Sequence, residues 1–430
     1  MTAASRVRGT DPDMEVVVLE RGRFTSYSAC GIPYVVGGVV SGGVEALVVR
    51  DPAEHRRRGL DVRIDHEVQD VDVAAGEVEF LDQRAGEVHR LGYDELLIAT
   101  GGEPVRPDLP GIDLPFVQGV QDLTDAQRLL ALAEQGCRRT VIVGGGYIGL
   151  EMAEAFIERG CAATVVEHAR QPLRLVDADF GQQVAAAMRE HGVEVLTETA
   201  VHGFEPGRVL TSAGPLAADL VVLGIGIAPR SALAVAAGID LGPNGASQVD
   251  RRQATSAEHV WAAGDCAASA HLVTGKPVHI ALGTYANKHG RVAGINMGGG
   301  DARSRAVLGT AITKLCELEV ALTGLREQEA IDAGIEAVSV TLEATTSAGY
   351  LPYARPMTVR MAAERGTGRL LGAQIVGGAG AAKRIDTVAT ALTAGMTVAD
   401  VAELDLAYAP PFASVWDPVA LAAREATKAV

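Results

Sequence analysis

Three glycines, Gly144, Gly146 and Gly149, follow an apolar run with the spacing Gly-x-Gly-x-x-Gly. Glycines at these positions let backbone amides and a helix N-terminus approach a phosphate group. The next apolar run ends in Glu167, whose carboxylate would bind a ribose 2′-hydroxyl and repel a 2′-phosphate. The pattern therefore predicts a nicotinamide dinucleotide site that favours NADH, while Arg170 leaves room for NADPH.

A second site of the same kind is predicted around another acidic residue, Glu20, which also ends an apolar run. A solvated carboxylate at a strand end is the plainer interpretation of Glu20 alone. Two further segments, one at 99–101 and one at 264–265, resemble the tails of nucleotide domains. Together with Glu20 they would surround one dinucleotide, and FAD fits such a site. The residues assigned to FAD are Glu20, Arg21, Ala99, Thr100, Gly101 and Asp265, and Gly226 is the counterpart of Gly101 in the nicotinamide site.

The two sites belong to two copies of one repeated pattern, and the first copy begins part-way through it. Residues 16–20 match the run that ends in Glu167, but the sequence before them is too short for a first strand and most of its glycine loop. Residues 2–8 are expected to form the back of the helix after that loop. We interpret Met1 as an internal methionine behind a missed upstream start; a true truncation is the alternative, and both leave FAD affinity open.

One cysteine, Cys30, has a context suited to sulfur chemistry, because Pro33 can occupy the first turn of a helix beside it. A helix N-terminus stabilises a thiolate, so the pKa of Cys30 is expected to be lowered. A buried, inert thiol is the alternative for Cys30. A buried, inert thiol is also what we expect for the other four cysteines. Because the chain has no Cys-x-x-Cys pair, the sequence suggests neither a disulfide framework nor a metal site. Those four are Cys137, Cys161, Cys266 and Cys316.

Composition limits the class of protein. The 430 residues are 48% hydrophobic and include 50 glycines, which is typical of an α/β protein with many tight turns. The net charge of −16 disfavours nucleic acid as a partner. No run reaches the length of a membrane span and no signal core is present, so a cytoplasmic protein is expected.

The predicted fold is α/β, with two doubly wound nucleotide-binding domains and a C-terminal α+β dimerisation domain. The expected boundaries are 1–110 for the first part of the FAD domain, 111–235 for the nicotinamide domain, 236–305 for the second part of the FAD domain and 306–430 for the C-terminal domain.

Five segments together resemble the single-cysteine, FAD-dependent pyridine nucleotide-disulfide oxidoreductases, a group with CoA-disulfide reductase, NADH oxidase and NADH peroxidase. They are Ser-Tyr-Ser-Ala-Cys-Gly-Ile-Pro-Tyr at 26–34, Gly-Gly-Gly-Tyr-Ile-Gly-Leu-Glu at 144–151, Ala-Ala-Gly-Asp at 262–265, Ala-Asn-Lys-His-Gly-Arg at 286–291 and Tyr-Ala-Pro-Pro-Phe at 408–412. The resemblance covers nearly the whole chain.

The resemblance implies a homodimer in which the C-terminal domain of one protomer covers the active site of the other. Tyr408 and Tyr350 would then reach the partner's cysteine as hydrogen-bond donors or general acids, or else serve only as interface packing. It also implies that Tyr147 is an aromatic gate over the flavin, with Glu151 nearby on the same helix. An exposed helix carboxylate is the plainer interpretation of Glu151.

These expectations combine into one hypothesis: electrons pass from NADH or NADPH through FAD to Cys30 and on to a small disulfide such as CoA disulfide. Oxygen or peroxide reduction through a cysteine sulfenic acid is the first alternative. An inactive nicotinamide-binding protein is the second. The sequence does not decide the electron acceptor.

A basic cluster in this acidic chain would suit the phosphates of coenzyme A. A solvated charged face is the alternative interpretation. The residues assigned to the phosphates are Arg6, Arg8, Arg57 and Arg58.

Overall fold

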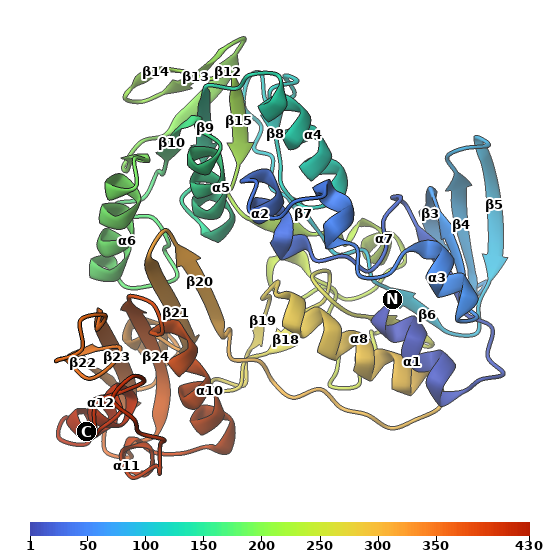
Figure 1. The fold of residues 1–430 in the computed structure, drawn as a ribbon. Coiled ribbons are helices and arrows are strands. Elements are labelled where there is room, and N and C mark those ends of the chain that lie inside the picture. The colour runs from blue at the N-terminus through green and yellow to red at the C-terminus, as the bar shows by residue number, and fades with distance from the viewer.

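The computed structural model describes residues 1–430 and contains three sheet-bearing regions that follow the predicted fold class (Figure 1). The nicotinamide domain holds a five-stranded parallel sheet with the strand order β11-β10-β9-β15-β8. Its central strands are buried on both faces, which explains their unbroken apolar runs. The bounds are β8 (Val117–Gln118), β9 (Arg139–Val143), β10 (Ala162–Val166), β11 (Glu194–Leu196) and β15 (Leu220–Leu223).

Helices cover this sheet and a small antiparallel sheet extends from one end of it. The helices are α4 (Leu123–Glu134), α5 (Tyr147–Glu158) and α6 (Ala178–Glu190), and the small sheet comprises β12 (Val201–Glu205), β13 (Arg208–Thr211) and β14 (Gly214–Ala217). The side chains of Phe156, Leu150 and Met152 on α5 are fully buried, so the helix is fixed against the sheet by its apolar face.

The FAD domain is built from two separate stretches of chain that meet through parallel strand pairs. β1 (Val17–Glu20) pairs with β2 (Asp61–Ile64), and β6 (Leu96–Ile98) pairs with β17 (Val260–Ala262). The antiparallel sheet β3 (His66–Asp72), β4 (Glu77–Asp82) and β5 (Glu87–Gly92) stands beside them. Through the β6–β17 pair, the residues that follow β17 in the second stretch lie beside those that follow β6 in the first.

The predicted N-terminal helix is confirmed as α1 (Thr2–Thr10), which packs against α8 (Gly283–Met297). The two helices meet closely because α8 carries glycine at the contact. A Cβ atom on Gly294 would stand 2.4 Å from the carbonyl oxygen of Ala3. Shorter elements complete the two nucleotide domains: α2 (Ile32–Val36), α3 (Pro52–Arg57), α7 (Ala232–Ala236), β7 (Gly102–Pro104), β16 (Ile227–Pro229), β18 (Ser269–Ala270) and β19 (Pro277–Val278).

The C-terminal domain is α+β, as predicted. Its five-stranded antiparallel sheet has the order β20-β21-β24-β23-β22, and its helices pack on the sheet around a separate apolar core. The strands are β20 (Ala311–Leu315), β21 (Leu318–Gly324), β22 (Ala337–Thr345), β23 (Pro356–Glu364) and β24 (Leu370–Gly377), and the helices are α9 (Glu327–Asp332), α10 (Ile385–Ala394), α11 (Val398–Ala402) and α12 (Pro418–Ala426). The exact domain boundaries stay a prediction.

None of the helices combines the length and the apolar character that crossing a membrane would require.

Candidate active site

The glycine loop of the nicotinamide domain has the geometry that its spacing predicts. Gly144 follows β9 with a left-handed φ of 100°, a conformation that favours glycine. A Cβ atom on Gly149 would stand 2.0 Å from the carbonyl oxygen of Gly144. The helix α5 begins at Tyr147, and its cap residue Gly146 offers no side-chain acceptor. The first-turn amides of α5 are therefore available to a phosphate.

Glu167 lies at the end of β10 beside this loop and is buried. Its Oε2 accepts a hydrogen bond from the amide of Gly145 at 2.8 Å, and its Oε1 accepts one from Ala169 at 2.8 Å. The carboxylate thus fixes the shape of the loop at the place where a ribose would bind. Arg170 is largely exposed and pairs with Glu198 at 3.6 Å. Gly226 follows β15 in a left-handed conformation.

Glu20 occupies the equivalent place in the FAD domain, at the end of β1. Its Oε1 accepts a hydrogen bond from the amide of Gly22 at 2.7 Å, and burial raises the pKa of the carboxyl group. Met1, at the start of α1, lies near enough for its amino group to interact with the Glu20 charge. Arg21 is partly exposed and pairs with Glu67 at 3.8 Å.

The other predicted FAD residues meet at one edge, because β6 and β17 are hydrogen-bonded neighbours that run in parallel. Ala99, Thr100 and Gly101 follow β6, and Asp265 follows β17 after a left-handed Gly264. Burial raises the pKa of Asp265, and His279 opposes this shift. The edge therefore carries a half-buried carboxyl group next to close backbone turns.

This arrangement fits FAD. The first turn of α1 has no side-chain cap, so its amides lack an internal acceptor, and the Glu20 charge acts on the Met1 amino group at the same helix end. A helix N-terminus beside a strand-end carboxylate is the arrangement that binds a dinucleotide's pyrophosphate and ribose. Asp265 and the turn at Gly101 extend the same site toward Cys30, whose pKa responds to the Asp265 charge.

Cys30 lies in a single 3₁₀ turn, Ala29–Gly31, immediately before α2. Pro33 is in the first turn of α2, as predicted. The residue after the cysteine must be small, because a Cβ atom on Gly31 would stand 2.3 Å from the Leu47 side chain.

The predicted lowering of the Cys30 pKa is wrong for this chain. Burial raises the pKa of the thiol, and the negative charges of Glu151 and Asp265 raise it further. The helix α2 is only five residues long, and a short helix provides little stabilisation for an anion. Although the residue is exposed by surface area, desolvation of the sulfur and the two carboxylates together raise its pKa.

Glu151 and Tyr147 lie on the first two turns of α5, which packs against α2. Glu151 is partly buried rather than exposed, and burial raises its pKa. Its Oε1 accepts a hydrogen bond from Thr313 Oγ1 at 2.8 Å. The Tyr147 hydroxyl is buried without a hydrogen-bond partner. Tyr34, on α2, is a further neighbour, because the charges of Glu151 and Cys30 raise its pKa.

Sequence reasoning assigned no role to Thr313, which comes from the C-terminal domain. Tyr34 was noted only as the last residue of the cysteine segment 26–34. Thr313 lies on β20, so a strand of the C-terminal domain contacts the helix that carries the predicted gate.

Two of the four predicted phosphate-binding arginines line one polar cavity of about 320 Å³. Arg6 and Arg58 face it, whereas Arg8 binds backbone carbonyls of the following loop and Arg57 does not line the cavity. The complete lining is Met1, Thr2, Ser5, Arg6, Ser26, Arg50, His55 and Arg58. Arg8 and Arg57 therefore lie outside the lining of this cavity, and their assignment to the coenzyme A phosphates stays a prediction.

Sequence reasoning missed Ser26, Arg50 and His55, three of the polar residues that line the cavity. Arg50 and Arg58 both pair with Glu54, at 3.4 and 2.9 Å. His55 is buried, its Nε2 lies 2.9 Å from Ser26 Oγ, and its Nδ1 has no partner. The only sequence signal was local, since His55 adjoins the arginine run. Ser26 belongs to the same loop as Cys30, so one loop joins the cavity to the cysteine.

Tyr350 and Tyr408 lie on exposed loops of the C-terminal domain and not at Cys30 of the same chain. Tyr350 is 76% exposed and Tyr408 is 48% exposed. The two loops are adjacent, because the amide of Ala348 donates to the carbonyl of Pro410 at 2.9 Å. In Figure 1 the end of this domain with α11 and α12 lies well away from α2.

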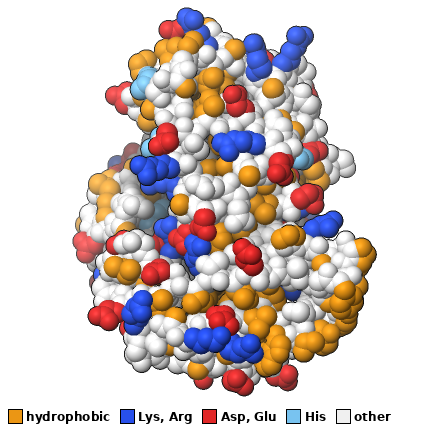
Figure 2. Space-filling model, turned by 90° about the vertical axis from the view of Figure 1, so that its left-hand side faces the viewer, with side chains coloured by type: hydrophobic (Ala, Val, Ile, Leu, Met, Phe, Trp, Pro, Cys, Tyr) orange, Lys and Arg blue, Asp and Glu red, His pale blue; other side chains and the backbone are white.

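These tyrosines belong to a larger exposed apolar patch. Its members are Tyr350, Tyr353, Tyr408, Phe412, Val415 and Trp416. Figure 2 shows hydrophobic side chains gathered over the lower part of that face, where the C-terminal domain lies. A patch of this kind marks an interaction surface.

Three of the other four cysteines are buried, as expected, and Cys137 is only partly buried. Burial raises the pKa of Cys161 to about 11 and that of Cys316 to about 12. These two thiols are therefore protonated near neutral pH, which agrees with the expectation that they are not nucleophiles.

Comparison with known families gives a match over both parts of the fold. Residues 1–290 match the family model "pyridine nucleotide-disulphide oxidoreductase", and residues 310–420 match its dimerisation domain. The chain belongs to the pyridine nucleotide-disulphide oxidoreductases. This membership confirms the resemblance, the fold class and the assignment as an oxidoreductase, and the cofactors of such a protein are FAD and a nicotinamide dinucleotide.

Individual members of the family are similar over nearly the whole of this chain. A Pyrococcus furiosus protein named NAD(P)H sulfur oxidoreductase (CoA-dependent) is 39% identical, over 99% of this chain and 96% of its own. A Methanocaldococcus jannaschii protein named NADH oxidase is 33% identical, over 100% of this chain and 96% of its own. The solved structure of an NAD-dependent persulfide reductase from A. fulgidus has a TM-score of 0.96 at 37% identity, covering 100% of this chain and 81% of that one.

Proposed function

We propose that this oxidoreductase uses NADH or NADPH to reduce a sulfur-sulfur bond in a substrate linked to coenzyme A, with CoA disulfide as the test substrate. One observation carries the proposal. A single loop places Ser26 in the wall of the arginine-lined cavity and Cys30 in the neighbourhood of Glu151 and Asp265. A substrate held by the cavity would thus have a route to the cysteine along one loop.

The cavity has the charge that coenzyme A phosphates require. Arg6, Arg50 and Arg58 provide guanidinium groups that donate charge-assisted hydrogen bonds to phosphate oxygens. Glu54 keeps two of them oriented. The unpartnered Nδ1 of buried His55 adds a polar atom on the same wall. The similar Pyrococcus protein, whose name includes CoA dependence, supports this assignment.

The proposed chemistry at Cys30 is thiol-disulfide exchange. When bound, FAD supplies the transfer of two electrons from the nicotinamide to sulfur. The Cys30 thiolate attacks one sulfur of CoA disulfide, the sulfur-sulfur bond breaks, and one CoA leaves as a thiolate that takes a proton. Cys30 is then in a mixed disulfide with the second CoA. Two electrons and a proton return Cys30 to the thiolate and release the second CoA as a thiol.

Residues of α5 would control access to this site. Tyr147 is the first residue of α5, and its partnerless hydroxyl imposes no hydrogen bond that movement would break. Glu151 places a negative charge near Cys30 and, after burial, is the second cause of the raised pKa of the thiol. The roles of Gly144, Gly146, Glu167 and Glu20 in binding the two dinucleotides follow from the loop and strand-end geometry.

The active protein is proposed to be a homodimer. The match to a dimerisation domain and the exposed apolar patch support this, since exposed apolar patches often mark protein-protein interfaces. Tyr408, and with it Tyr350, would donate hydrogen bonds at the partner subunit's cysteine. A cytoplasmic location, where NADH and NADPH are available, is part of the proposal.

The first test compares three variants in an assay of NADH consumption with CoA disulfide. Cys30→Ser should abolish turnover. Arg58→Ala should raise KM for CoA disulfide by roughly two- to fivefold, because a charge-assisted contact from a half-exposed guanidinium contributes about 0.5 to 1 kcal/mol. Arg57→Ala is the matched control, since Arg57 lies outside the cavity. Full activity in Cys30→Ser would refute the proposal.

The second test examines the shared active site. Mixing inactive Cys30→Ser protein with low-activity Tyr408→Phe protein should restore activity, because a mixed dimer holds one site with both residues intact. Random exchange between protomers would give about a quarter of the wild-type rate. No recovery after demonstrated exchange would place both residues in one protomer's site or exclude Tyr408 from it.

Oxygen or peroxide reduction is the alternative function, which the similar protein named NADH oxidase favours. Cys30 would then pass through a sulfenic acid instead of a mixed disulfide. Consumption of NADH with oxygen but not with CoA disulfide would select this alternative. A colourless purified protein without flavin absorbance would instead favour an inactive nicotinamide-binding protein.

A further inference from the structure

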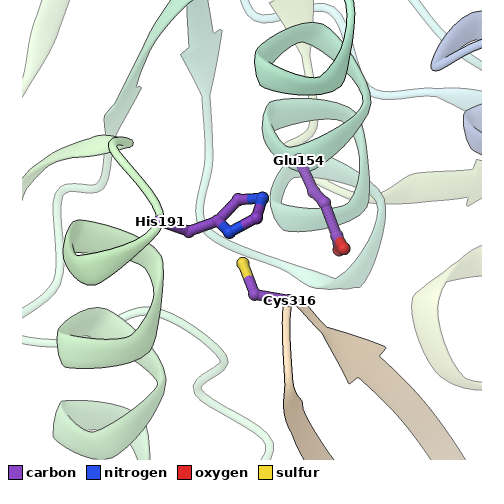
Figure 3. Close-up of side chains that lie close together, drawn as sticks. All are labelled: Glu154, His191 and Cys316. Carbon is purple, nitrogen blue, oxygen red and sulfur yellow. The ribbon is translucent and has the colours of Figure 1, made fainter.

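Three side chains with metal-binding atoms meet at the junction between the nicotinamide domain and the C-terminal domain. They are Glu154 on α5, His191 at the end of α6 and Cys316 in the turn between β20 and β21. Their possible ligand atoms all lie within 4.8 Å of one another. Figure 3 shows the imidazole ring, the carboxylate and the sulfur pointing into one shared space.

The backbone holds the sulfur in this position. Leu315 pairs with Leu318, so Cys316 is the first residue of a two-residue hairpin turn, and it adopts a left-handed φ of 56°. Such a conformation is uncommon for a residue with a side chain. Cys316 is 5% exposed, and its sulfur lies 3.8 Å from Met188. The turn thus directs a thiol into the domain junction.

The histidine is oriented by a second carboxylate. His191 Nε2 lies 3.1 Å from Glu158 Oε1, and Glu158 is one helical turn after Glu154 on α5. A carboxylate on one ring nitrogen fixes the imidazole and leaves the other nitrogen free to bind a metal. In Figure 3 one ring nitrogen faces the sulfur of Cys316. The arrangement matches the carboxylate-histidine pairs that support metal sites.

We propose that Glu154, His191 and Cys316 bind one divalent cation of the zinc class. Thiolate, imidazole and carboxylate are the ligands that zinc accepts, and the mixture of sulfur and nitrogen donors disfavours magnesium or calcium. Zinc-ligand bonds of about 2.0 to 2.3 Å place tetrahedral ligands about 3.5 Å apart, so only side-chain adjustment is needed. The Cys316 thiol loses its proton to solvent on binding, and water completes the four ligands.

The cation would connect α5 and α6 to the β20–β21 hairpin. The same α5 carries Glu151, which contacts Thr313 on β20. Metal binding would therefore reinforce the junction that fixes the gate helix against the C-terminal domain. The sequence predicted no metal site, because the three ligands are far apart along the chain and form no spaced motif.

The test measures cation binding to the purified flavoprotein. Protein treated with a chelator is dialysed against Zn²⁺, and bound zinc is counted per chain; Co²⁺ then serves as a spectroscopic probe, because thiolate-bound tetrahedral Co²⁺ absorbs at longer wavelengths than flavin. We expect one equivalent in the wild type and in the control Cys266→Ala, whose buried cysteine lies elsewhere. Cys316→Ala and His191→Ala should each lose that equivalent and its cobalt spectrum.

Thermal unfolding provides a second measurement that does not depend on activity. Zn²⁺ should raise the unfolding temperature of the wild type but not that of Cys316→Ala. If Cys316→Ala fails to fold, Glu154→Gln keeps the side-chain shape and should bind Zn²⁺ at least tenfold more weakly. Unchanged zinc stoichiometry in all three variants, or no zinc in the wild type, would overturn the proposal.

Discussion

Thr313 donates a hydrogen bond of 2.8 Å to Glu151, which joins the first strand of the C-terminal domain to the helix that begins with the nicotinamide glycine loop. The bond opposes the rise that burial causes in the Glu151 pKa. A residue of the dimerisation domain thus controls the charge of a carboxylate that influences Cys30 in the same chain.

Thr313→Val should therefore raise the pKa of Glu151 further, because the valine has the same shape but donates no hydrogen bond. The pH profile of kcat/KM for NADH should move its acidic limb to higher pH. Unfolding in denaturant should show a loss of about 0.5 to 1.5 kcal/mol, the net value of one hydrogen bond. Thr313→Ser, which keeps the hydroxyl, is the control. An identical profile for valine and serine would contradict this role.

Glu151→Gln should lower the pKa of Cys30. Glu151 is the second cause of the raised thiol pKa after burial, and removal of its negative charge favours the thiolate. At a fixed pH below the thiol pKa the thiolate fraction therefore increases. The rate of Cys30 alkylation, measured across pH 6 to 10 with mass-spectrometric identification of the site, should move to lower pH. Glu158→Gln, farther along α5, should leave the alkylation profile in place; equal shifts in both variants would argue against a direct charge effect.

Gly149→Ala should weaken both folding and NADH binding. The added Cβ atom would stand 2.0 Å from the Gly144 carbonyl oxygen, so α5 has to move from β9. Overpacking of this kind costs roughly 1 to 3 kcal/mol, measured as a lower midpoint of denaturant unfolding. Gly146→Ala is a useful contrast, because its Cβ atom would meet nothing nearer than 3.5 Å and its φ is −78°. Stability equal to the wild type in both variants would rule out the close helix-strand contact.

The glycine loop shows what could be predicted from the sequence. The strand, the turn, the helix and Glu167 lie within one short stretch, so local spacing alone determined their geometry. The carboxyl ends of β6 and β17 were predicted to meet for a related reason, since parallel strands in a nucleotide domain end at one edge.

Contacts between distant segments could not be read in this way. Arg6, Arg50 and Arg58 line the cavity and Arg57 does not. Which arginines line it depends on the direction of each side chain on α3 and on the neighbouring segments, and the sequence does not reveal that direction. The predicted direction of the Cys30 pKa shift was wrong for the same reason. The motif shows the adjacent helix, whereas the opposing charges of Glu151 and Asp265 arrive through tertiary packing.

His289, on α8, should make the protein less stable in mild acid. Its side chain is 4% exposed, and burial, followed by the charge of Lys288, lowers its pKa to about 4. The unfolded chain has a histidine pKa near 6.5, so between these two values the unfolded state binds more protons and stability falls as the pH falls. The expected loss on going from pH 7 to pH 4 is roughly 1 to 3 kcal/mol from this group.

His289→Gln cannot take up the proton, so its unfolding free energy should depend less steeply on pH over this window, as measured by urea unfolding at several pH values. His202, an exposed histidine on β12, gives the control substitution, and parallel pH curves for wild type and His289→Gln would refute the assignment.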